Sequence, residues 1–118
     1  MLNQNRINKV YLALGPTDLR KSINGLSLIV QESFKLNPFS RNLFVFCNRK
    51  QDKIKILECD NNGFWLHYKR LEKSRFRWPD GNAGSTITID ERQFRWLLDG
   101  LSINQKDAHP VVNERIII

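Results

Sequence analysis

Cysteine, histidine and long apolar stretches are all scarce in this sequence of 118 residues. Two cysteines, Cys47 and Cys59, are too few for a disulfide framework or a cysteine-based zinc site. No apolar run approaches the roughly 18 residues that a membrane-spanning helix needs, and the first residues lack the apolar core and cleavage site of a signal peptide. We therefore expect a single domain over residues 1–118 that has no membrane segment and stays in the cytoplasm.

The familiar catalytic patterns are also missing. The sequence contains no phosphate-cradling glycine loop, no paired Cys/His ligand set and no nucleophile elbow. His67 and His109 lie far apart, and candidate carboxylates such as Asp18 and Asp60 have simpler roles as cap or turn residues. Because no set of nucleophile, base and orienting group can be assembled, we expect a protein that is not an enzyme and uses no metal or cofactor.

Hydrophobic spacing predicts an α+β fold: an antiparallel β-meander sheet with one long N-terminal helix and one short C-terminal helix. The long helix is expected over about 18–35, with Thr17 as its N-cap and Asp18 in its first turn. Asp90 and Gln93 form a capping box that opens the short helix, which ends at Gly100. The core is expected over about 8–101 with a loosely held tail over 102–118, and the strands over 9–14, 43–47, 53–59, 64–71 and 85–89.

Turn chemistry joins the middle three strands into the meander. The first turn is expected to place Cys47 opposite Lys53. The second, built on the two-residue hairpin signal Asn62-Gly63, is expected to place Lys55 opposite Arg70. Apolar residues then fall on both faces of the sheet, so we expect helices, loops or a partner to cover both sides.

The formal net charge is +7, and its distribution is uneven. Nine of the nineteen Lys and Arg residues lie between Arg49 and Pro79, where only four acids accompany them. If residues 73–79 are extended, the cations Lys73, Arg75 and Arg77 point one way and the aromatic rings the other. The cations could contact phosphates while the rings stack on an unpaired base, or the rings could enter the core.

This charge pattern defines the candidate site residues. The candidate nucleic-acid-binding residues are Lys53, Lys55, Lys69, Arg70, Lys73, Arg75 and Arg77. The candidate stacking or interface anchors are Trp65, Phe76 and Trp78. Arg20 and Lys21, beside the predicted start of the first helix, form a possible phosphate or partner site, although a purely structural strand–Gly-Pro–helix junction is the favoured interpretation.

Several sequence blocks resemble, in order and spacing, one known family. They are Gly15-Pro16-Thr17-Asp18-Leu19-Arg20-Lys21, Pro38-Phe39-Ser40, Lys53-Ile54-Lys55-Ile56-Leu57, Gly63-Phe64-Trp65-Leu66, Tyr68-Lys69-Arg70-Leu71-Glu72, Arg75-Phe76 and Trp78-Pro79. Over about residues 10–101 the chain is similar to the small accessory protein (TnpB type) encoded beside the transposase in the sixty-six family of bacterial insertion sequences. That family is distinct from the RNA-guided nuclease that shares the TnpB name.

The resemblance implies a role in transposition, with the chemistry supplied by a separate transposase. Two hypotheses follow for the partner. In the first, the basic-aromatic segment binds DNA, either transposon ends or target. In the second, the chain is a protein-interaction adaptor for the transposase of the same element, with no direct DNA contact.

Overall fold

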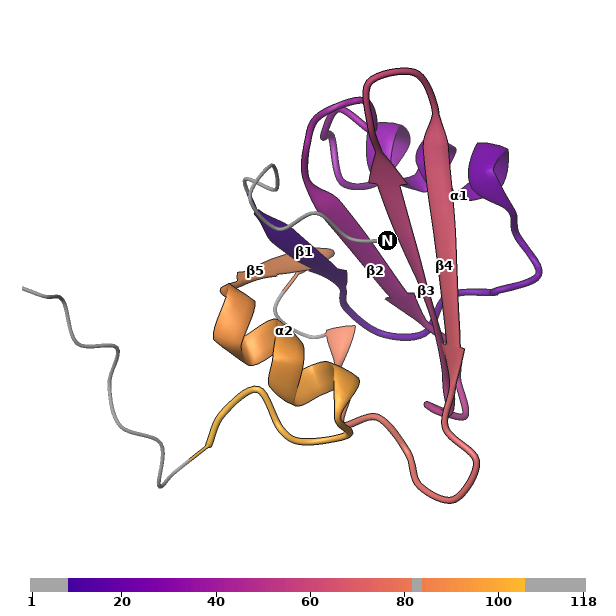
Figure 1. Cartoon of the computed structure of the whole chain (residues 1–118). Helices are drawn as coiled ribbons and strands as arrows, with labels where there is room; N and C mark the ends of the chain where they lie inside the picture. Colours follow the sequence, from indigo (N-terminus) through magenta and orange to yellow (C-terminus); the bar gives the residue numbers. More distant parts are fainter. Residues whose placement is uncertain (1–8, 82–83, 106–118) are drawn as a thin grey trace, which may run out of the picture.

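The computed structural model describes residues 9–81 and 84–105, which form five strands and two helices (Figure 1). The elements are β1 (Val10–Ala13), α1 (Ile23–Glu32), β2 (Leu43–Cys47), β3 (Lys53–Cys59), β4 (Phe64–Arg70), β5 (Thr86–Ile89) and α2 (Glu91–Leu98). The strands form one sheet in the order β4-β3-β2-β1-β5. None of the helices in these residues is long and apolar enough to cross a membrane.

The sheet is mixed. Strands β2, β3 and β4 are antiparallel neighbours, which confirms the predicted meander. Strand β1, however, pairs in parallel with β2, placing Val10 opposite Leu43, and β5 pairs antiparallel with the other edge of β1. The expectation of an antiparallel sheet is therefore wrong for β1, because the chain between β1 and β2 crosses over through α1 instead of turning back in a hairpin.

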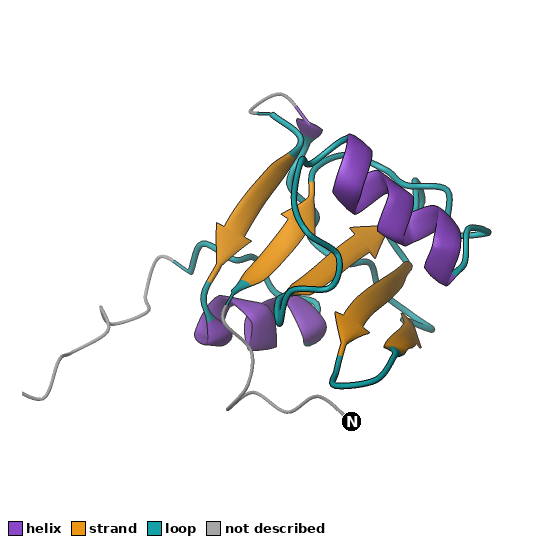
Figure 2. Cartoon of the chain, turned by 90° about the horizontal axis from the view of Figure 1, so that it is seen from above, coloured by secondary structure: helices purple, strands orange, loops and turns teal. Residues whose placement is uncertain are grey.

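Both faces of the sheet are covered, as the two-sided apolar pattern predicts (Figure 2). Helix α1 packs on one face, where Leu26 and Val30 are buried with Phe44 and Phe46. Helix α2 packs on the other face together with residues 71–79. We call these the α1 face and the α2 face of the sheet.

The long N-terminal helix is not observed. Helix α1 starts at Ile23 after the N-cap Ser22, not near Asp18. The Thr17 N–H instead donates to the Cys47 carbonyl at the end of β2 at 2.7 Å, and the Asp18 carboxylate accepts from the Arg20 backbone N–H within the same loop. The helix ends at Glu32, before Lys35, which adopts a left-handed φ of 58°.

Both hairpin registers differ from the predicted ones. Cys47 lies opposite Ile54, one residue from the expected partner, and Lys53 lies opposite Arg70. In the second hairpin the Asp60 Oδ1 accepts from the N–H groups of Asn62 and Gly63, which closes a four-residue loop in place of the two-residue turn. A shift of one residue exchanges the two faces of a strand, so the turn geometry decides which side chains meet.

The C-terminal helix matches its prediction. Asp90 and Gln93 form the expected capping box, and Gly100 follows the helix with a φ of 82°. Beyond the predicted core, Ile103 is buried and its carbonyl accepts from the Gln93 side chain. Residues 106–118 of the predicted tail, which include His109, lie outside the described residues.

Residues 71–79 attach to the α2 face through alternate side chains. Phe76 is 1% exposed and Trp78 is 8% exposed, while Lys73, Arg75 and Arg77 are exposed. The Phe76 N–H donates to the Gln51 carbonyl, and the Trp78 indole N–H donates to the Ala13 carbonyl at 2.8 Å. Two buried rings, the backbone hydrogen bond of Phe76 and the indole hydrogen bond of Trp78 thus hold this segment against the sheet.

The substitution Trp78→Phe tests this attachment. It removes a buried hydrogen bond and the outer ring of the indole, so we expect the free energy of unfolding to fall by about 1–3 kcal/mol. Urea unfolding followed by circular dichroism measures the change. Trp65→Phe is the matched control, because Trp65 is 52% exposed and its replacement costs less. Equal decreases in the two variants would contradict a structural role for Trp78.

Candidate anion-binding cleft

Two loops meet where the parallel strands β1 and β2 end. Residues 14–22 follow β1, and residues 48–52 follow β2, so the parallel pairing brings both loops to the same edge of the sheet. Gly15 turns the first loop with a φ of 73°, a conformation that residues with a Cβ rarely adopt. Ligands commonly bind outside the carboxyl ends of strands in sheets with parallel pairing, so this edge is where a site is expected.

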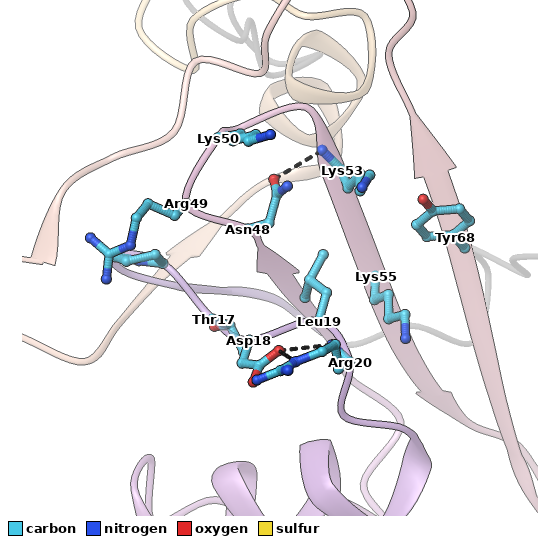
Figure 3. Close-up of a pocket in the computed structure, with 11 residues that line it drawn as sticks. Thr17, Asp18, Leu19, Arg20, Asn48, Arg49, Lys50, Lys53, Lys55 and Tyr68 are labelled. Carbon is cyan, nitrogen blue, oxygen red and sulfur yellow. Dashed lines mark hydrogen bonds and ion pairs between the residues drawn. The ribbon is translucent and has the colours of Figure 1, made fainter.

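A cleft of about 750 Å³ lies at this edge, which is within the usual size range of ligand pockets (Figure 3). The two loops and the adjoining strands β3 and β4 supply its walls. It is lined by Pro16, Thr17, Asp18, Leu19, Arg20, Asn48, Arg49, Lys50, Lys53, Lys55 and Tyr68. We refer to this feature as the basic cleft.

The basic cleft carries a strong excess of positive charge. Five of its lining residues are cations, and Asp18 is its single acid. Asp18 is already paired, because the Arg20 guanidinium donates to both carboxylate oxygens at 2.8–3.2 Å. Hydrogen bonding from the Arg20 side chain lowers the pKa of Asp18 to about 2 and raises the pKa of Arg20. The arrangement therefore favours an anion.

The β2–β3 turn presents two of these cations. The Asn48 Oδ1 accepts from the backbone N–H groups of Asp52 and Lys53, and the Asn48 side-chain amide donates to Asp52 at 2.7 Å. That last bond lowers the pKa of Asp52. Arg49 and Lys50 stand exposed at the tip of this closed turn.

Strands β3 and β4 supply the opposite wall. Lys55 lies directly opposite Tyr68. The pair Leu57 and Leu66, two positions along the strands, packs in the α1-face core. Because side chains alternate along a strand, Lys53, Lys55 and Tyr68 all lie on the α1 face. The Lys55 Nζ donates to the Lys21 carbonyl at 3.1 Å, just before α1. Tyr68 is 54% exposed.

The structure brings together only some of the cations predicted from the sequence. Lys53, Lys55 and Arg20 line the cleft, and Arg70 lies opposite Lys53 while pairing with Glu72 at 2.7 Å. Lys69 lies on the α2 face, where its Nζ donates to the Leu98 carbonyl at the end of α2. The remaining members, Lys73, Arg75 and Arg77, are exposed on the segment after β4, and Lys21 is exposed beside the cleft.

The three candidate anchors separate as well. The interpretation of Phe76 and Trp78 as stacking or interface anchors needs correction, because both rings are buried in the α2-face core. Trp65 is exposed, but its indole N–H donates to Asp60 at 2.7 Å, which lowers the pKa of that carboxyl. Its ring stacks on His67, which in turn bonds to Glu58 on the α2 face.

Sequence reasoning misses three of the cationic and aromatic members of the cleft. Arg49 and Lys50 belong to the basic segment but are not among the candidate binding residues, and the two-residue turn gives Tyr68 a partner two residues from its true one. The four-residue loop at Asp60 is the missing signal, since the correct register aligns Tyr68 with Lys55.

Metal-binding and thiol chemistry find no support in the described part of the chain. No group of three or more His, Cys, Asp or Glu residues there could hold a metal ion. Cys47 and Cys59 are free thiols, and burial raises the pKa of Cys47 to about 12. A thiol held so far from ionisation at neutral pH is a poor nucleophile.

The substitution Arg20→Gln tests the charge state of the cleft. It removes the guanidinium that lowers the pKa of Asp18, so the titration midpoint of Asp18 should rise from about 2 towards its ordinary value of 3.8. Carboxyl-carbon NMR across an acid titration measures this shift. An unchanged midpoint would show that the Arg20 guanidinium does not control the pKa of Asp18. Arg95→Gln, on α2, is the control and should leave the midpoint unchanged.

Comparison with known proteins places the chain in a family. It is 41% identical over 101 residues to the uncharacterized protein y4hO of Sinorhizobium fredii, covering 86% of this chain and 87% of that protein. A second uncharacterized protein of the same organism, y4jC, is 27% identical over 111 residues and 94% of each chain. No solved structure matches significantly. The family model described as "IS66 Orf2 like protein" matches residues 8–108, so the chain belongs to this family of insertion-sequence proteins.

Proposed function

We propose that this protein is a non-catalytic accessory factor of insertion-sequence transposition that binds DNA at the basic cleft and assists a separate transposase. Membership of the IS66 Orf2-like family supports the transposition role. The basic cleft supports the DNA contact.

One observation carries the proposal: Arg20 pairs with the single acid of the cleft, Asp18, and four further cations line the same cleft. Phosphate groups receive most protein contacts to DNA, and Lys and Arg are their usual partners. The cations come from three separate parts of the chain, the loop after β1, the β2–β3 turn and strand β3. The fold therefore brings Arg20 beside four cations that already lie within residues 49–55.

The predicted DNA-binding cations outside the cleft fall into two groups, those that already have a structural partner and those that are exposed. Lys69 is held against the end of α2, and Arg70 is paired with Glu72, so each already has a structural partner. Arg75 and Arg77 are exposed and could extend the phosphate contacts along residues 71–79.

The double variant Arg49→Ala/Lys50→Ala tests the cleft against the extended segment. If both residues neutralise phosphates, the slope of log affinity against log salt should become shallower by about 1.8 for duplex DNA, at roughly 0.9 for each phosphate that is no longer neutralised. Mobility-shift titrations from low to moderate salt measure the slope.

Arg75→Ala/Arg77→Ala is the matched control, since it removes the same charge from exposed positions. We expect a smaller change in slope from this control. A larger effect from the control would move the DNA contact to residues 71–79, and the absence of any binding at low salt would refute the proposal.

A second candidate function, an adaptor for the transposase, is favoured by a separate observation. Phe39 is 67% exposed and packs against Phe64 with ring centroids 5.2 Å apart. Trp65 is exposed on the neighbouring position of β4. Phe39 and Phe64 lie on the α1 face and Trp65 on the α2 face, so aromatic rings stand on both faces at the start of β4, which we call the aromatic end, whereas Tyr68 and the basic cleft lie further along the strand. Exposed aromatic residues are frequent anchors in protein interfaces.

The double variant Phe39→Ala/Trp65→Ala tests this adaptor role. Removal of both rings should abolish co-purification of the transposase of the same element while leaving DNA affinity unchanged. Leu28→Ala, which removes an apolar side chain that is 55% exposed on α1, is the control and should retain the transposase. Retention by the aromatic variant would exclude the aromatic end as the docking surface.

A further inference from the structure

We propose that the basic cleft binds an unpaired stretch of a DNA strand and that Tyr68 stacks on one of its bases. This inference rests on the proposed function, because it assigns the form of DNA that the cleft accepts. It adds Tyr68 as a binding residue and gives the cleft a ligand of defined chemistry.

Tyr68 is the aromatic member of the basic cleft, and its ring is available. The residue lines the cleft, is 54% exposed and belongs to neither core cluster. Among the described residues, its ring takes part in no aromatic pair and no cation–π contact. An exposed tyrosine on a sheet surface commonly covers neighbouring side chains, but this one faces a cavity bounded by cations (Figure 3).

The surroundings of Tyr68 supply the phosphate contacts. Lys55 lies opposite Tyr68, and Lys53 lies two residues before it on the same face of β3. Arg49 and Lys50 line the cleft from the neighbouring turn. A positively charged groove combined with an aromatic ring is the usual construction of sites for single strands, where the cations follow the backbone and the ring stacks on a base.

The concave shape selects an unpaired strand over a duplex. In a duplex, neighbouring bases cover both faces of every base, so a tyrosine ring inside a cleft reaches a base only after unpairing and unstacking. An unpaired strand exposes its base faces without that cost. Phosphate contacts alone would bind an unpaired strand and a duplex alike. The position of Tyr68 among the cations therefore makes the cleft favour the unpaired strand.

Trp65 offers a control on the same strand. It is exposed to a similar extent as Tyr68, at 52% against 54%. It lies opposite Glu58 and stacks on His67, so it belongs to the α2 face and not to the cleft. Removal of either ring therefore deletes a similar exposed aromatic surface from opposite faces of β4.

Fluorescence anisotropy with a labelled 20-nucleotide strand and with its duplex tests the inference on the full chain. We expect the single strand to bind more tightly than the duplex at equal salt. Tyr68→Ala should weaken single-strand binding roughly 5- to 150-fold, the range for removal of one stacked base, and leave duplex binding nearly unchanged. Tyr68→Phe keeps the ring and should retain the affinity, as should Trp65→Ala.

The outcomes separate the two levels of the proposal. Equal binding of strand and duplex, or equal weakening in Tyr68→Ala and Trp65→Ala, would overturn the unpaired-strand inference while leaving DNA binding intact. No binding of either probe at low salt would overturn the proposed function and the inference together. Circular dichroism of each variant checks the fold, which substitution of a half-exposed side chain should preserve.

Discussion

The parallel pairing of β1 with β2 is the constraint on which the rest of the molecule depends. Parallel neighbours cannot be joined by a tight turn, so the chain must cross one face of the sheet, and α1 covers that face as a result. The same pairing places the loops after both strands at one edge, where the Thr17 N–H bonds to the Cys47 carbonyl. The cleft is thus a consequence of strand direction.

The meander adds the second half of this arrangement. The turn after β2 closes through the Asn48 side chain and sets the register of β3, which turns Lys53 and Lys55 towards the crossover. The loop at Asp60 then sets the register of β4 and brings Tyr68 opposite Lys55. Two side-chain-capped turns therefore determine which cations and which ring share one face.

Local features of the molecule are predictable from the sequence, and features that depend on distant contacts are not. The bounds of β2, β3 and the capping box of α2 follow from nearby turn and cap residues. The parallel pairing joins segments that are distant in the chain, and Thr17 is bonded to the end of β2 instead of capping the helix. In the site, the sequence indicates Lys53 and Lys55, but Tyr68 requires the correct register and the burial of Trp78 requires the α2-face core.

The closed β2–β3 turn also affects the entropy of binding. Its backbone is bonded internally through Asn48 and externally through the carbonyls of Gln51 and Asp52, which accept from Phe76 and Leu71. Arg49 and Lys50 therefore extend from a backbone that is already ordered before any ligand arrives. Association needs to immobilise only their side chains, at about 0.5–1.5 kcal/mol each, without the further loss of freedom that a mobile loop would add.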